Sequence, residues 1–151
     1  MLVPWYDLDR QPEYFIIGGC ILQRLTGTYL AARGQDWTGT VEPHLYNYLL
    51  NEAFKPTDMR KAIIVLSFIL PGDINLGYHG LSQLVIDNIN GVKIRSMKDI
   101  PEALALNSQA KYDVIEFELD GPKIILDRTK MQSANLIIAK TYGIDKPANI
   151  K

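Results

Sequence analysis

The sequence of 151 residues is poor in the residues that build disulfide or metal sites. Cys20 is the only cysteine, so the chain cannot form an internal disulfide. The cysteine content therefore does not indicate whether the protein works in an oxidising or a reducing compartment. The two histidines stand in neither a Cys-x-x-Cys nor a His-Glu-x-x-His pattern, so we expect no metal site. The chain has 16 basic and 17 acidic residues, which give a net charge of −1. Without a basic excess, we expect binding neither to nucleic acid nor to an anionic membrane.

Long apolar runs and a leader are also missing. The longest apolar run, residues 62–71, is too short to span a bilayer. The first ten residues have no basic segment followed by a long apolar stretch, so we expect no signal peptide.

The sequence lacks the combination of groups that a hydrolase needs. Neither His44 nor His79 adjoins a Gly-x-Ser-x-Gly turn, and Ser67 lies inside an apolar run. Cys20 is more simply a small buried apolar residue than a catalytic thiol. The pair Gly18-Gly19 lacks the third glycine and the following helix of a dinucleotide site. We therefore expect no catalytic residue and no cofactor, and infer that the chain is not an enzyme by itself.

Hydrophobic residues make up 47% and charged residues 22% of the chain, a composition typical of a single globular domain. The apolar patterns predict strands separated by tight turns such as Asn90-Gly91. The expected strands lie at residues 15–25, 62–70, 83–89, 92–94, 113–119 and 123–127, and the expected helices at 26–33, 43–53, 96–107 and 129–142. This order favours an α+β fold with a small, mostly antiparallel barrel or sandwich and helices at its ends.

The glycine pair is the least expected feature of the strand predicted at residues 15–25. Glycine weakens a strand, and it usually marks a kink or a place where another backbone approaches closely. Gly18 and Gly19 therefore form either a structural kink or a main-chain site for a bound peptide.

From about Pro12 onward the chain resembles the carboxy-terminal, extended PDZ domain of the HtrA/Deg serine proteases, especially the plant type. The resemblance rests on "YFIIGGCILQRLT" (14–26), "GQDW" (34–37) and "IIVLSFILPGDINLGY" (63–78), then on "VIDNINGVKIRSMKDIPEAL" (85–104) and "FELDGPKIIL" (117–126). It implies a lead-in at residues 1–13 and a circularly permuted PDZ-like domain at 14–151. That domain would carry a helical insertion at about 35–60 and an extra carboxy-terminal helix.

The resemblance also implies a peptide groove. The carboxylate-binding loop maps onto residues 14–19 and the peptide-pairing strand onto 20–24, while the groove helix maps onto 96–107. The implied peptide-binding residues are Phe15, Ile16, Ile17, Gly18, Gly19, Cys20 and Ile21 on the loop and strand, with Ile100, Ala103 and Leu104 on the helix. Backbone N–H groups at the glycines would hold the terminal carboxylate.

Two functions follow from the resemblance. One is a regulatory, substrate-tethering module that binds peptide carboxyl termini or unfolded segments for a protease of the quality-control type. The other is an assembly module whose groove is closed by its own insertion or by neighbouring protease or PDZ domains, and whose surfaces form a homo-oligomer. The long insertion favours the second and the glycine pair the first. A bacterial parent would imply the periplasm or envelope.

Overall fold

The computed structural model describes residues 13–26, 62–106, 109–118 and 123–150. Its strands are β1 (Tyr14–Ile17), β2 (Cys20–Arg24), β3 (Ile64–Ile69), β4 (Leu84–Ile89), β5 (Val92–Lys93), β6 (Tyr112–Phe117), β7 (Ile124–Asp127) and β8 (Ala148–Asn149). Its helices are α4 (Asp99–Ala105), α5 (Arg128–Tyr142) and the 3-10 turn η2 (Asp73–Asn75). The helices expected at 26–33 and 43–53, the insertion at 35–60 and nearly all of the lead-in lie outside the described residues.

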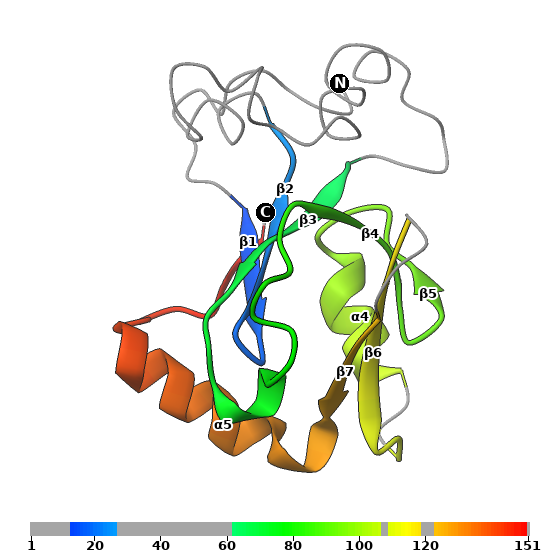
Figure 1. Ribbon diagram of the computed structural model, residues 1–151. Coiled ribbons are helices and arrows are strands. Elements are labelled where there is room, and N and C mark those ends of the chain that lie inside the picture. The colour runs from blue at the N-terminus through cyan, green and yellow to red at the C-terminus, as the bar shows by residue number, and fades with distance from the viewer. Residues whose placement is uncertain (1–12, 27–61, 107–108, 119–122, 151) are drawn as a thin grey trace.

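The strands form one antiparallel sheet in the order β7-β6-β4-β3-β2-β1-β8, and β5 pairs with β4. Only two residue pairs join β3 to β4, and they connect the half of the sheet made of β8, β1, β2 and β3 to the half made of β4, β5, β6 and β7. Figure 1 shows α4 between these halves and α5 running across one end of the molecule. The expected α+β class with antiparallel pairing is confirmed.

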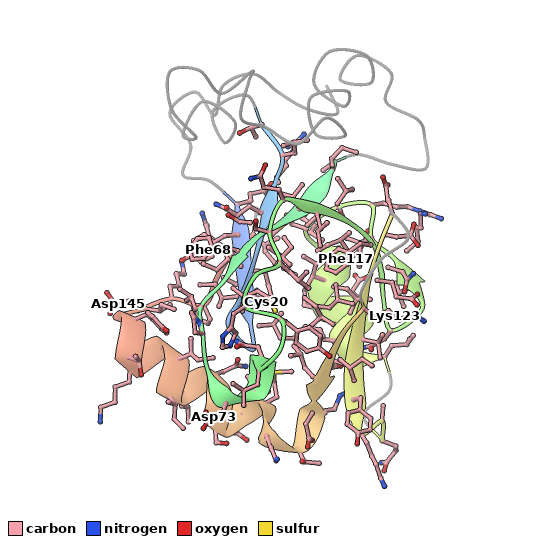
Figure 2. All side chains as sticks on the ribbon, in the orientation of Figure 1. Cys20, Phe68, Asp73, Phe117, Lys123 and Asp145 are labelled. Atoms are coloured by element: carbon pink, nitrogen blue, oxygen red, sulfur yellow. The ribbon has the colours of Figure 1, made fainter. Side chains whose placement is uncertain are left out.

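The apolar run at residues 62–70 forms the central strand β3, as its lack of alternation predicts. It lies between β2 and β4 and is buried along its length except at Phe68. Figure 2 shows Cys20 inside the molecule and Phe68 at its outer surface. The core of buried side chains therefore lies between the two halves of the sheet and includes Leu22 and Ile100.

The strand predicted at residues 15–25 is wrong as a single element, because the glycine pair turns the chain back on itself. Gly18 and Gly19 have φ angles of 55° and 85°, and Ile17 pairs with Cys20 across a two-residue loop. Two positive φ angles in succession are the geometry of a type I′ hairpin turn. Asn90 and Gly91, with φ angles of 54° and 81°, make a turn of the same kind between β4 and β5, as expected.

Helix α4 is shorter than the helix expected at residues 96–107. The carboxylate of Asp99 accepts hydrogen bonds from the backbone N–H groups of Arg95 and Ser96, at 2.8 and 3.0 Å. These bonds form a turn ahead of the helix, which then begins at Asp99. Asp99 therefore stabilises the turn that leads into the helix.

Helix α5 begins one residue before the helix expected at residues 129–142 and ends where that helix was expected to end. The side chain of Asp127 accepts a hydrogen bond from the backbone N–H of Thr129, at 2.9 Å, and Gly143 ends the helix with a φ of 68°. The hydroxyl of Thr129 also donates to Asp127, at 2.6 Å, and this bond is the main cause that lowers the pKa of Asp127. The helix buries Met131 and Ile138 and contacts β6, β7 and η2.

Candidate functional site

The hairpin turn at Gly18-Gly19 is buried and has no space for side chains. A Cβ atom on Gly19 would lie 2.3 Å from the carbonyl oxygen of Leu70 and 2.5 Å from Nδ2 of Asn75. A Cβ atom on Gly18 would lie 2.9 Å from Cδ1 of Leu126. Glycine is therefore required at Gly19 by space as well as by φ, whereas at Gly18 the φ angle is the stronger requirement, because the end of the Leu126 side chain can shift.

Three backbone polar groups of this turn are bonded to other parts of the same chain. The N–H of Gly18 donates to Oδ1 of Asn135 on α5, at 2.8 Å, and the carbonyl of Gly18 accepts from Nδ2 of Asn75, at 2.7 Å. The carbonyl of Gly19 accepts from the N–H of Leu70, at 2.8 Å. The N–H of Gly18, the first donor expected to meet a ligand carboxylate, is thus already engaged by a side chain.

Asn75 fixes the turn to the loop after β3. It is fully buried, and its Nδ2 donates to the carbonyl oxygens of both Gly18 and Leu70. Its Oδ1 accepts from the N–H of Gly72, at 3.0 Å. One buried amide therefore joins three backbone groups from two loops that are distant in sequence.

Strand β2 has partners on both sides, β1 on one and β3 on the other. The strand expected to pair with a peptide, residues 20–24, therefore has no open edge in this structure. The edge next to it belongs to β1, where β8 pairs with Tyr14 and Phe15 and the N–H of Ile16 donates to the carbonyl oxygen of Pro147, at 2.8 Å. β1 has only one residue beyond Ile16, and this residue, Ile17, pairs with Cys20 of β2.

A groove of about 480 Å³ lies beside this edge, between β1, the end of α4 and the first half of α5. Most of the residues that line it are apolar: Phe15, Ile16, Ile17, Leu104, Ala105, Asp113, Arg128, Met131, Asn135 and Pro147. Of the predicted binding residues, the structure brings Phe15, Ile16, Ile17 and Leu104 together here.

The other predicted binding residues lie elsewhere. Gly18 and Gly19 form the buried turn described above, and Ile21 is a half-buried residue of β2. Ile100 and Ala103 have no exposed surface and belong to the core. Cys20 is also fully buried, and burial raises its pKa to about 12. Its thiol stays protonated at neutral pH, which argues against a catalytic thiolate.

The groove's two charged groups neutralise each other. Nη2 of Arg128 lies 2.5 Å from Oδ1 of Asp113, whose side chain is only 5% exposed. The same Nη2 donates to the carbonyl oxygen of Leu104, and Oδ1 of Asp113 also accepts from Nδ2 of Asn90, at 2.9 Å. The hydrogen bond to Asp113 raises the pKa of Arg128. The pair therefore joins the end of α4 to the start of α5 and adds little net charge to the groove.

Sequence reasoning missed six of the lining residues: Ala105, Asp113, Arg128, Met131, Asn135 and Pro147. The helix at 129–142 was expected as an additional element, but no local pattern shows that it lines a groove. Its polar Asn135, in register with the buried Met131 and Ile138, was the available signal.

The described residues contain no group of three or more acidic, histidine or cysteine side chains placed to hold a metal ion. None of the described helices is long and apolar enough to cross a membrane.

A protein-family model described as a PDZ domain matches residues 3–149. The protein named "Protease Do-like 2, chloroplastic" from Arabidopsis thaliana is 28% identical over 144 residues, which are 95% of this chain and 22% of that protein. "Putative protease Do-like 3, mitochondrial" from the same plant is 25% identical over 95% of this chain and 23% of its own length.

This chain spans less than a quarter of the length of these curated relatives. Because the PDZ match takes in nearly all of its residues, the chain is a non-catalytic domain, as the missing nucleophile–base pair predicts. The chain belongs to the PDZ domain family, and its relatives are proteases of the HtrA/Deg type.

Proposed function

We propose that this PDZ domain binds an extended peptide in the groove between β1, α4 and α5, and that it tethers substrates for a protease of the HtrA/Deg type. The observation that carries the proposal is the groove itself. It brings the apolar residues Phe15, Ile16 and Ile17 of β1 together with Leu104 of α4 in one lining. An apolar channel beside a strand suits an extended peptide, whose side chains enter the channel.

The ligand is an unfolded segment or a carboxyl terminus with an apolar residue. The lining is mostly apolar, and its single cation is paired with Asp113. An apolar side chain therefore gains more from this groove than a charged one does. We expect weak binding, with Kd on the order of micromolar.

Fluorescence polarisation with a library of labelled peptides tests the proposal. Ala105→Glu places a charge at an exposed residue of the groove, whereas Leu106→Glu places the same charge at the next residue, which is 69% exposed and outside the lining. We expect Ala105→Glu to weaken binding by about tenfold and Leu106→Glu to change it little. Equal effects of the two variants, or no peptide bound by the wild type, would reject the groove as a substrate site.

The second candidate function is an assembly module with an occluded groove. It is favoured by the pairing of β2 on both sides and by the bond between Gly18 and Asn135. A neighbouring domain of a longer protein, or a second copy, would then hold the domain through other surfaces. Sedimentation-velocity measurements across a concentration series test this alternative, which predicts concentration-dependent association and no binding of library peptides.

A further inference from the structure

Asn135 lies midway along α5, lines the groove and bonds to the hairpin turn. The backbone N–H of Gly18 can only donate, so the atom of Asn135 that faces it must be the oxygen. This bond fixes the orientation of the side-chain amide. The NH₂ group is consequently the part of the amide that remains for other partners.

The NH₂ group of Asn135 has no hydrogen-bond partner among the described residues. Asn75, on the other side of the same turn, differs in this respect, because its Nδ2 donates to two carbonyl oxygens and its Oδ1 accepts from a backbone N–H. Asn75 uses its whole amide to hold the fold, whereas Asn135 uses only its oxygen. A half-buried donor in a mostly apolar groove is satisfied by water or by a ligand acceptor.

We propose that Asn135 is the residue that positions the bound peptide, because its Nδ2 donates a hydrogen bond to a backbone oxygen of that peptide. The inference rests on the proposed peptide-binding function and adds the atom that recognises the ligand. The oxygen is a main-chain carbonyl or a terminal carboxylate, since both present the same kind of acceptor. The donor thus comes from the carboxy-terminal helix and takes the place of the glycine N–H, which Asn135 itself engages.

A backbone oxygen is the acceptor that the surroundings favour. Residues of β1 line the groove, and an extended peptide lying in it would present its carbonyl oxygens at regular intervals. The charge of Arg128 is offset by the buried Asp113, so no uncompensated cation draws an acidic side chain into the groove. The neutral donor on Asn135 therefore sets where the peptide backbone lies, while the apolar lining selects a neighbouring side chain.

The variant Asn135→Asp separates this role from a structural one. A carboxylate still accepts the hydrogen bond from Gly18, but it has no N–H to give to a peptide. We expect the unfolding midpoint to stay near that of the wild type and the affinity for peptide to fall by about tenfold or more, since a ligand oxygen then meets an acceptor. Gln132→Glu, on the exposed side of the same helix, adds the same charge outside the groove and should leave affinity unchanged.

A second variant keeps the proposal testable if Asn135→Asp alters folding. Asn135→Ser replaces the amide with a hydroxyl on a shorter side chain, and we expect weaker peptide binding in a folded domain, as judged by circular dichroism. Peptides with a free and with an amidated carboxyl terminus identify the oxygen. An equal loss for both forms in Asn135→Asp assigns a main-chain carbonyl, and a larger loss for the free acid assigns the terminal carboxylate.

The outcomes for the two proposals differ. If the wild type binds peptide and Asn135→Asp binds it equally well, Asn135 does not position the ligand, although the groove remains a binding site. If the wild type binds no peptide, the proposed function itself fails.

Discussion

Substitution of alanine for Gly19 tests the structural role of the hairpin turn. The added Cβ would lie 2.3 Å from the carbonyl oxygen of Leu70 and 2.5 Å from Nδ2 of Asn75, so the backbone of one loop must move. Alanine at a positive φ costs about 1–2 kcal/mol, and overpacking of a tight site costs a further ~1–3 kcal/mol. We therefore expect Gly19→Ala to lower the free energy of unfolding by about 2–5 kcal/mol, a large part of a typical domain's stability.

Gly77 provides the matched control, because its φ of 91° is close to the 85° of Gly19 while a Cβ there meets nothing within 4 Å. Gly77→Ala should cost only the conformational part, about 1–2 kcal/mol. Urea unfolding followed by circular dichroism, without any peptide present, gives both values. If the two variants lose the same stability, the close approach of Leu70 and Asn75 to the turn is not what requires glycine at this position.

Three further predictions concern the core and the insertion. Asn75→Ala should lower the free energy of unfolding, measured in urea, by about 2–4 kcal/mol, because the buried carbonyl of Gly18 loses the hydrogen bond from Asn75. A loss below ~0.5 kcal/mol would contradict this prediction. Burial raises the pKa of Cys20 to about 12, so stability should fall as pH rises from about 8.5 towards that value, because only the unfolded thiol ionises. In Cys20→Ala the free energy of unfolding should fall less steeply with pH than in the wild type. The same slope in both proteins would show that ionisation of the Cys20 thiol is not the cause. Leu45→Asp with Leu49→Asp, in the helix predicted at 43–53, should lower the melting temperature or break an oligomer; if neither changes, the assembly hypothesis loses its main support.

The elements that the sequence predicted well have local causes. The unbroken apolar run of β3 indicates a strand buried on both faces, and Asn90-Gly91 is the common sequence of a type I′ turn. Helix α5 ends at Gly143, which adopts the left-handed conformation that the sequence signal implies. In each case the residues that determine the structure adjoin one another in the chain.

The glycine pair was harder to interpret, because glycine suits a hairpin turn, a bulge and an anion site equally well. Distant residues decide between them: Asn75 and Asn135 bond the turn from two other elements. The expected groove helix shows a similar limit. Its apolar stripe, with Ile100 and Ala103 in the core, leaves only its last turn to face the groove. Which part of one stripe enters the core depends on residues that are distant in the sequence.

The central claim is that the space between β1, α4 and α5 receives an extended peptide. Chemical-shift mapping of the isotopically labelled chain, titrated with a peptide selected from a random library, tests it most directly. The account predicts saturable shifts at residues 14–18, 104–105 and 128–135, including the side-chain amide of Asn135. Saturable binding that leaves these residues unchanged and moves signals elsewhere in the domain would contradict it.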